Sequence, residues 1–202
     1  AMVRISKTPD ERKQEIIEAA QTLFLEKGYI QTKVSDIVKR IGVSQGIFYY
    51  YYPTKEAVVE EIVDRYINLH LSGARKVLKK NELSPLKKLE KMADTQLDIN
   101  HRENNNIHAI KGVDIHERIL NRLVVDYIPL MLEAFDKPGD EFTRLRFEVF
   151  VTAGNVLFDP GIFSWSPSER NKRIDGLISM MEESLDQPEG SFSFYRNLMG
   201  YV

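Results

Sequence analysis

Residues 45–55 read QGIFYYYYPTK and bring together side chains that can bind an anion or the edge of a base. The amide of Gln45 offers a donor beside an acceptor, the phenols of Tyr49 and Tyr51 donate from rigid rings, and Lys55 adds a cation. Four consecutive tyrosines cannot all be core residues, because a helix of about eight residues cannot bury every face. The stretch therefore indicates a surface on which some rings pack and others bind a polar partner.

Two short helices joined by the residues IGVS must position these groups. Gly42 can adopt the positive φ that a tight interhelical turn needs, and Ser44 can cap the second helix with its hydroxyl. At about 100° per residue, Phe48 faces one side of that helix while Gln45 and Tyr49 face another. This pattern predicts a helix-turn-helix, whose second helix enters the DNA major groove with its first residues at the base edges.

Apolar residues recur at helical spacing almost throughout the chain, and no stretch alternates as a strand would. We therefore predict an all-α fold, with a three-helix head at residues 1–54 and a larger helical domain at 55–202. Capping boxes begin the helices after Thr8 and Ser166. The predicted helices are 9–27, one starting after Thr32, one opened by Ser44 and stopped by Pro53, and then 54–80, 85–101, 104–111, 114–136, 141–158, 167–186 and 191–199.

The composition narrows the possible classes of protein. The 202 residues are 43% hydrophobic, which is enough for a substantial core, and the absence of cysteine excludes disulfides, thiol nucleophiles and Cys-type zinc sites. No apolar run approaches the ~18 residues of a membrane span, and the start of the chain has no apolar signal region. These features favour a cytoplasmic protein with no membrane partner.

Charge is distributed unevenly along the chain. Residues 1–55 hold nine Lys and Arg against six Asp and Glu, a net charge of +3, whereas residues 56–202 hold nineteen against twenty-four, a net charge of −5. A basic head on an acidic body favours a polyanionic partner for the head. An excess of three charges is also common by chance, so it adds little support for a polyanionic partner.

The segment IIEAAQTLFLEKGYIQTKVSDIVKRIGVSQGIFYYYYPTKEAVVEEIV, residues 16–63, resembles the DNA-binding head of the TetR family of transcriptional regulators. The matching features include Gly28 four residues before Thr32, the Gly-Val-Ser turn, Gly46, and an ending of aromatic-Pro-Thr-Lys-Glu. They cover about a quarter of the chain, and the remainder matches only in being helical. The resemblance implies a homodimer that binds a palindromic operator in double-stranded DNA and responds to a small-molecule effector, most often as a repressor.

Carried over by position, the resemblance implies a set of DNA contacts on the second and third helices and the start of the fourth. Two positions depart from the family: Lys33 stands where a hydroxyl residue is common, and Ile47 stands where a polar residue is common. Ile47 cannot hydrogen-bond, so a thymine methyl is the contact open to it, and base readout falls mainly to Gln45, which favours adenine. The DNA-contact candidates are Thr32, Lys33, Ser35, Ser44, Gln45, Gly46, Ile47, Tyr49, Tyr50, Tyr51 and Lys55.

The larger domain offers weaker indications of its function. By resemblance, the apolar helices at 144–158 and 173–185 are the expected dimer interface, and the domain holds an effector cavity. The candidates to line that cavity are His70, His108, Tyr127, Met131, Phe150, Asn155 and Trp165. Each of them is equally explained as ordinary core. His108, Asp114 and His116 lie close in sequence but fit no strong metal-binding signature, so we predict no metal and no cofactor.

No phosphate-binding glycine loop, nucleophile elbow or zinc-protease motif appears, so the sequence does not predict an enzyme. The function it favours is that of a ligand-responsive transcriptional regulator. The alternative is a helical DNA-binding or protein-interaction module without a small-molecule ligand. The effector, the operator sequence, the regulated genes and the choice between repressor and activator are not encoded in any pattern that we recognise.

Overall fold

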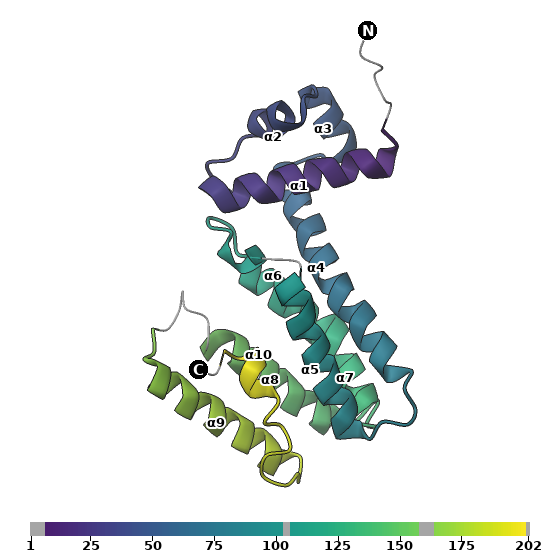
Figure 1. The fold of residues 1–202 in the computed structure, drawn as a ribbon, viewed down its shortest axis with the longest axis vertical. Helices are drawn as coiled ribbons and strands as arrows, with labels where there is room; N and C mark the ends of the chain where they lie inside the picture. Colours follow the sequence, from purple (N-terminus) through teal and green to yellow (C-terminus); the bar gives the residue numbers. More distant parts are fainter. Residues whose placement is uncertain (1–6, 103–105, 158–163, 201–202) are drawn as a thin grey trace. The chain divides into compact units, whose positions relative to one another are not determined.

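The structure is a computed structural model that describes residues 7–102, 106–157 and 164–200, and these residues form helices joined by turns and loops, with no strand among them (Figure 1). They divide into two compact units. The first unit holds the residues up to Tyr66 together with Asn106–Ile115, and the second unit holds the rest. The all-α prediction is confirmed. That residues 1–54 form a DNA-binding domain and residues 55–202 a ligand-binding and dimerisation domain stays a prediction.

The first unit begins with α1, Pro9–Lys27, whose limits are those predicted. The Thr8 hydroxyl accepts a hydrogen bond from the Glu11 amide at 3.2 Å, and the Glu11 carboxylate accepts one from the Thr8 amide at 2.6 Å. This reciprocal capping box satisfies two amides that have no partner within the helix. These bonds also lower the pKa of Glu11. Gly28, with a φ of +86°, ends the helix.

Three further helical segments complete the head around one core. They are α2, Val34–Ile41, α3, Gln45–Tyr51, and the first part of α4, Lys55–Leu78. Gly42 joins α2 to α3 with φ 70° and ψ 35°, the left-handed conformation that the sequence predicts. The fully buried side chains of this core come from all four helices and include Ile16, Ala20, Phe24, Ile37, Phe48 and Val58.

A segment distant in sequence also packs on the head. It contains the 3₁₀-helix η1, Asn106–Ala109, which contacts α1, and it continues to Ile115. The Tyr29 amide donates a hydrogen bond of 2.8 Å to the Lys111 carbonyl. Next to this bond, a Cβ atom added to Gly112 would lie 2.9 Å from Cγ1 of Ile30. Glycine is therefore required there both by its φ of +84° and by the close approach of Ile30.

Gly112→Ala should lower the free energy of unfolding by about 2–3 kcal/mol, because it adds a steric overlap to the strain of a left-handed backbone. Gly139→Ala is the matched control, since Gly139 has the same φ of +84° but no atom within 4 Å of the added Cβ. That control should show only the backbone strain of about 1 kcal/mol. Thermal and urea unfolding measure both variants, and equal losses would contradict the proposed contact with Ile30.

The described residues of the second unit form a bundle from the end of α4 and seven later helical segments. Helix α7 packs against α5 and α8, α8 packs against α9, and the short α10 contacts α5 and α9. A Ser166 capping box begins α9, as predicted. The segments are α5, Pro85–Arg102; α6, Ile115–Arg122; η2, Leu123–Tyr127; α7, Ile128–Ala134; α8, Glu141–Leu157; α9, Pro167–Ser184; and α10, Tyr195–Leu198.

Three predicted helices differ from the structure. The single helix expected over 114–136 is α6 and α7 joined by a π-helical turn, in which the Ile128 amide donates to the Leu123 carbonyl. Pro129 follows directly and has no amide hydrogen, so the regular bonding pattern cannot continue through it. The helices expected at 104–111 and 191–199 are confined, among the described residues, to four residues each, Asn106–Ala109 and Tyr195–Leu198.

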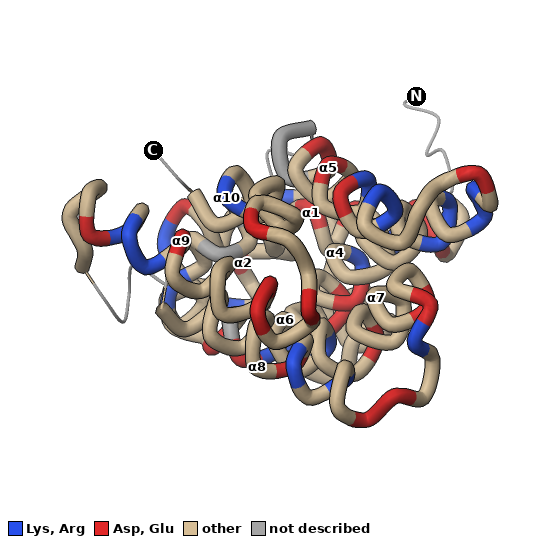
Figure 2. The backbone as a smooth tube through the Cα atoms, turned by 90° about the horizontal axis from the view of Figure 1, so that it is seen from below, with Lys and Arg blue, Asp and Glu red and all other residues tan. Residues whose placement is uncertain are grey.

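Basic and acidic residues are interspersed along the helices (Figure 2). Several ion pairs among the described residues join side chains three or four residues apart on one helix, as between Lys87 and Glu90 at 2.6 Å. None of the described helices is both long enough and apolar enough to cross a membrane.

Candidate nucleic-acid interface

Helix α3 separates its aromatic rings into an inner and an outer set. Phe48 is 0% exposed and Tyr52, just past the helix end, is 4% exposed, with 6.2 Å between their ring centroids. On the other side, Tyr49 is 52% exposed and Tyr50 is 79% exposed. The helix is thus anchored by buried rings and presents phenols to the solvent, as the spacing predicts.

The remaining α3 candidates also lie on the surface. Gln45, Gly46 and Ile47 are exposed, and Tyr51 is half-buried with its ring edge-on to the Tyr50 ring, 4.9 Å between centroids. Ser44 occupies the N-cap position, but its hydroxyl forms no capping bond, contrary to expectation. The first turn is held instead by the main chain, where the Ile47 amide donates to the Ser44 carbonyl at 3.1 Å. Contact of these residues with DNA stays a prediction.

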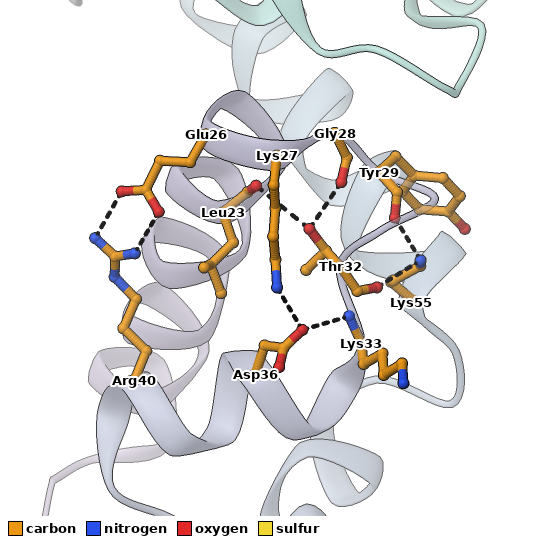
Figure 3. A network of polar contacts seen from close by, with 10 residues as sticks. All are labelled: Leu23, Glu26, Lys27, Gly28, Tyr29, Thr32, Lys33, Asp36, Arg40 and Lys55. Atoms are coloured by element: carbon orange, nitrogen blue, oxygen red, sulfur yellow. Dashed lines mark hydrogen bonds and ion pairs between the residues drawn. The ribbon is translucent and has the colours of Figure 1, made fainter.

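Thr32 is buried, which differs from the expected DNA-facing side chain. Its hydroxyl donates to the Gly28 carbonyl at 2.8 Å, and the Leu23 carbonyl lies at 3.3 Å (Figure 3). The side chain thus binds the end of α1 to the start of α2. Because its hydroxyl is committed to these carbonyls, Thr32 positions the turn, and it is not available as a side-chain contact on the surface.

Lys55 also has internal partners in place of the expected free cation. Its ammonium donates to the Tyr29 carbonyl at 2.6 Å and to the Thr32 carbonyl at 2.7 Å, and it lies 4.0 Å from the centroid of the Tyr29 ring (Figure 3). Partial burial lowers the pKa of Lys55, and the nearby Glu56 opposes that shift. The lysine therefore fastens the α1–α2 turn to the start of α4.

The other cations around the turn fall into two groups. Lys27 pairs with Asp36 at 2.6 Å, and Arg40 pairs with Glu26 at 2.9 Å. The pKa of Asp36 is lowered first by the bond from Lys27 and second by the bond from the Lys33 amide. By contrast, the Lys33 ammonium is exposed and has no hydrogen bond or ion pair with a described residue, and Ser35 is likewise exposed. These two candidates remain available on the surface, at the start of α2.

The Tyr52 hydroxyl is buried, and no hydrogen-bond partner for it occurs among the described residues. Burial, with a smaller contribution from Glu61, raises the pKa of Tyr52 to about 12. The folded state thus favours the neutral phenol, and this contribution to stability is present below pH 10 and is lost as the pH rises towards 12.

Tyr52→Phe should therefore raise the free energy of unfolding by about 1 kcal/mol, because it removes a buried hydroxyl that lacks a partner. It should also weaken the loss of stability between pH 10 and 12. Tyr49→Phe, at an exposed ring, is the control and should leave both unchanged. A destabilised Tyr52→Phe protein in chemical denaturation would show that the hydroxyl has a binding partner.

In the second unit, most effector-cavity candidates are core residues. His70, Tyr127, Met131 and Phe150 are buried. The Asn155 amide donates to the Val151 carbonyl at 2.9 Å. The Trp165 indole donates to the Leu157 carbonyl at 2.9 Å, and its ring lies 3.7 Å from the Arg173 guanidinium. The side chain of His108 lies outside the described residues.

Tyr195 interacts with two of these candidates, Phe150 and Tyr127, but the sequence does not single it out as a residue of the effector site. Its ring lies 5.0 Å from that of Phe150, and burial raises its pKa. Burial also raises the pKa of Tyr127 well above the usual value, and Tyr195 adds to that shift. Both phenols are thus held neutral. The cluster of aromatic residues at 192–195 could have marked this position in the sequence.

No group of three His, Asp or Glu side chains that could hold a metal ion occurs among the described residues. Of the sequence cluster considered for a metal, the side chains of His108 and His116 fall outside that set.

The head defines a class of protein, one with a helix-turn-helix on an all-α body. The family model of bacterial regulatory proteins, tetR family, matches residues 16–62. An uncharacterized HTH-type transcriptional regulator, YuxN of Bacillus subtilis, is 43% identical over 56 residues, which are 28% of this chain and 19% of that protein. The HTH-type transcriptional repressor KstR2 of Mycolicibacterium smegmatis is 32% identical over 81 residues, 40% of this chain and 39% of that protein.

Among solved structures, a TetR-like transcriptional regulator from Rhodococcus sp. RHA1 matches 96% of this chain and 100% of its own, with a TM-score of 0.56 at 17% identity. This likeness shows the shared fold. The chain spans less than half the length of the two curated relatives that it matches. Residues 16–62 of its head match the model of the TetR family of bacterial regulators, as the resemblance of the sequence predicts. The family and these relatives are transcriptional regulators and not enzymes, in agreement with the sequence-based expectation.

Proposed function

We propose that this protein is a homodimeric transcriptional repressor that binds a palindromic operator and is released from it by a small-molecule effector. The observation that carries the proposal is the outer face of α3, where Gln45 and Tyr49 are exposed while Phe48 and Tyr52 anchor the helix from behind. An amide and phenols on the first turns of a recognition helix suit base edges and phosphates. Lys33, exposed at the start of α2, adds a cation to the surface of the head.

Dimerisation is supported by an apolar stripe on α8. Phe142, Leu145, Val149 and Val156 are exposed and follow a spacing of three, four and seven residues, which places them along one side of the helix. On α9, which packs against α8, Met180 is exposed as well. Exposed apolar side chains on two neighbouring helices mark a surface that a second copy would cover. Val149→Glu should therefore yield a monomer in sedimentation experiments and lower operator affinity.

The effector part of the proposal is supported by the buried, neutral phenols of Tyr127 and Tyr195 and by the Phe150 ring, which lies 5.0 Å from that of Tyr195. Such groups would orient a largely apolar molecule through a few hydrogen bonds. The π-helical turn that ends at Tyr127 adds support, because such turns occur frequently at functional sites. The sign of regulation is supported by the family and by the KstR2 relative, which is named a repressor.

In vitro selection from a pool of random duplexes tests the proposal. We expect a palindromic consensus with half-sites about one helical turn apart, ~34 Å or slightly more, and an affinity that falls steeply with salt. Mass spectrometry of compounds that co-purify with the protein would identify an effector, and adding that compound should release the operator. Failure to enrich any duplex would refute DNA binding. Enrichment without any releasing compound would favour a DNA-binding module that has no ligand.

A further inference from the structure

The outer face of α3 carries no charged side chain. The seven residues of the helix read QGIFYYY, and those that reach the surface carry amide, aliphatic and phenol groups. Two cations of the head are engaged elsewhere, since Lys27 pairs with Asp36 and the Lys55 ammonium binds main-chain carbonyls, and the exposed Lys33 belongs to the start of α2 and not to α3. A helix of this composition would read bases without a cation.

The absence of a cation on α3 restricts which bases the helix can select. Guanine is most often recognised by arginine or lysine, which donate to its O6 and N7 atoms. The hydrogen-bonding group in the first turn of α3 is the Gln45 amide, whose matched partner is the N6 and N7 edge of adenine. Adenine is therefore the purine that this helix is equipped to recognise.

On a different side of the helix from Gln45 and Tyr49, Ile47 and Tyr50 form a second exposed row on α3. These two residues are three apart, so they share one side of the helix, and they are 39% and 79% exposed. The Tyr50 ring rests edge-on against the Tyr51 ring at an interplanar angle of 88°, which restricts its rotation. The apolar group that B-DNA presents in its major groove is the C5-methyl of thymine.

We infer that the row of Ile47 and Tyr50 reads thymine methyl groups, so that the half-site beneath α3 consists of A·T pairs with no guanine contacted by this helix. This inference rests on the proposed DNA-binding function and names the class of operator. It makes Ile47 and Tyr50 specificity-determining residues in addition to Gln45.

The first test is the base composition of duplexes selected by the full-length protein. An A·T-rich core in each half-site is expected, whereas an invariant G·C pair that depends on Ile47 or Tyr50 would overturn the inference. Each conserved thymine is then replaced by deoxyuridine, which removes only the methyl group and keeps the base pairing. Loss of one buried methyl contact should weaken binding about fourfold.

The matched variants locate the methyl contact on the protein. Ile47→Ala should bind the thymine duplex about fourfold more weakly than the unaltered protein and should no longer distinguish thymine from deoxyuridine. Lys33→Ala, the control, should weaken binding to both duplexes equally and keep the discrimination. If Ile47→Ala and Tyr50→Ala both discriminate as well as the unaltered protein, the inference is wrong. If no duplex is selected at all, the proposed DNA-binding function itself fails.

Discussion

Phe48→Ala should remove about 3–5 kcal/mol from the free energy of unfolding and abolish operator binding. Phe48 is 0% exposed, and its ring lies 5.4 Å from that of Tyr49 and 6.2 Å from that of Tyr52. Removing the ring leaves a cavity behind a helix of only seven residues, which has little stability of its own. The buried Phe48 ring holds α3 in place and so fixes the position of its exposed face. Stability and DNA affinity should therefore be lost together.

Tyr50→Ala is the matched control for Phe48→Ala, because it removes an aromatic ring of similar size from the opposite side of α3. At 79% exposure, its loss should change stability by no more than about 0.5 kcal/mol. Thermal unfolding followed by circular dichroism measures both variants. Similar melting temperatures for the two would mean that α3 does not depend on its buried ring.

Lys55→Met should weaken operator binding at least tenfold and should do so by loosening the α1–α2 turn. The methionine keeps most of the apolar stem but removes the ammonium that donates to the Tyr29 and Thr32 carbonyls at 2.6 and 2.7 Å. Charged hydrogen bonds of this kind contribute about 1.5–3 kcal/mol, and the partial exposure of Lys55 favours the lower end of that range. A loss of stability should therefore accompany the loss of affinity.

The salt dependence of binding separates this internal role from a phosphate contact. Removing a lysine that binds phosphate reduces the slope of log affinity against log salt by about 1. Lys55→Met should leave that slope unchanged. Lys33→Met, at an exposed ammonium with no partner among the described residues, should reduce the slope by about 1 without loss of stability. The opposite pattern would assign the phosphate contact to Lys55.

Much of the structure of the head can be predicted from residues that lie close together in the sequence. The limits of α1 follow from the Thr8 capping box and from Gly28, and the turn to α3 follows from Gly42; these features act within a few residues of each other. The exposure of Gln45 and Tyr49 likewise follows from helical periodicity alone. Patterns of this range can be read without any knowledge of tertiary contacts.

The roles of Thr32 and Lys55 depended on longer-range contacts. Their partners are main-chain carbonyls at residues 23–32, and Lys55 is more than twenty residues from the carbonyls that it binds. The pattern of side chains in a sequence does not show where a main-chain carbonyl points. The sequence therefore predicts both residues as exposed DNA contacts. The docking of residues 106–115 on the head is hidden for the same reason, because the Tyr29–Lys111 bond joins two main-chain groups.

In the second unit, the sequence indicated helices but not their interruptions. The π-helical turn before α7 arises because Pro129 cannot donate a hydrogen bond, and a proline near a helix start is usually tolerated. The cluster of Tyr127, Phe150 and Tyr195 brings together side chains from η2, α8 and α10, which helical spacing does not encode. The identity of an effector depends on such packing and is not visible in the sequence.

The most direct test of the central claim is hydroxyl-radical footprinting of the tyrosines, resolved by tandem mass spectrometry with and without a selected duplex. In the free protein, Tyr49 and Tyr50 should react quickly, while the buried Tyr52 and Tyr195 react slowly and serve as internal controls. The duplex should protect Tyr49 and Tyr50 and leave the slow pair unchanged. Rapid labelling of Tyr52 in the free protein, or full reactivity of Tyr49 and Tyr50 on the duplex, would contradict the account of α3 as a ring-anchored recognition helix.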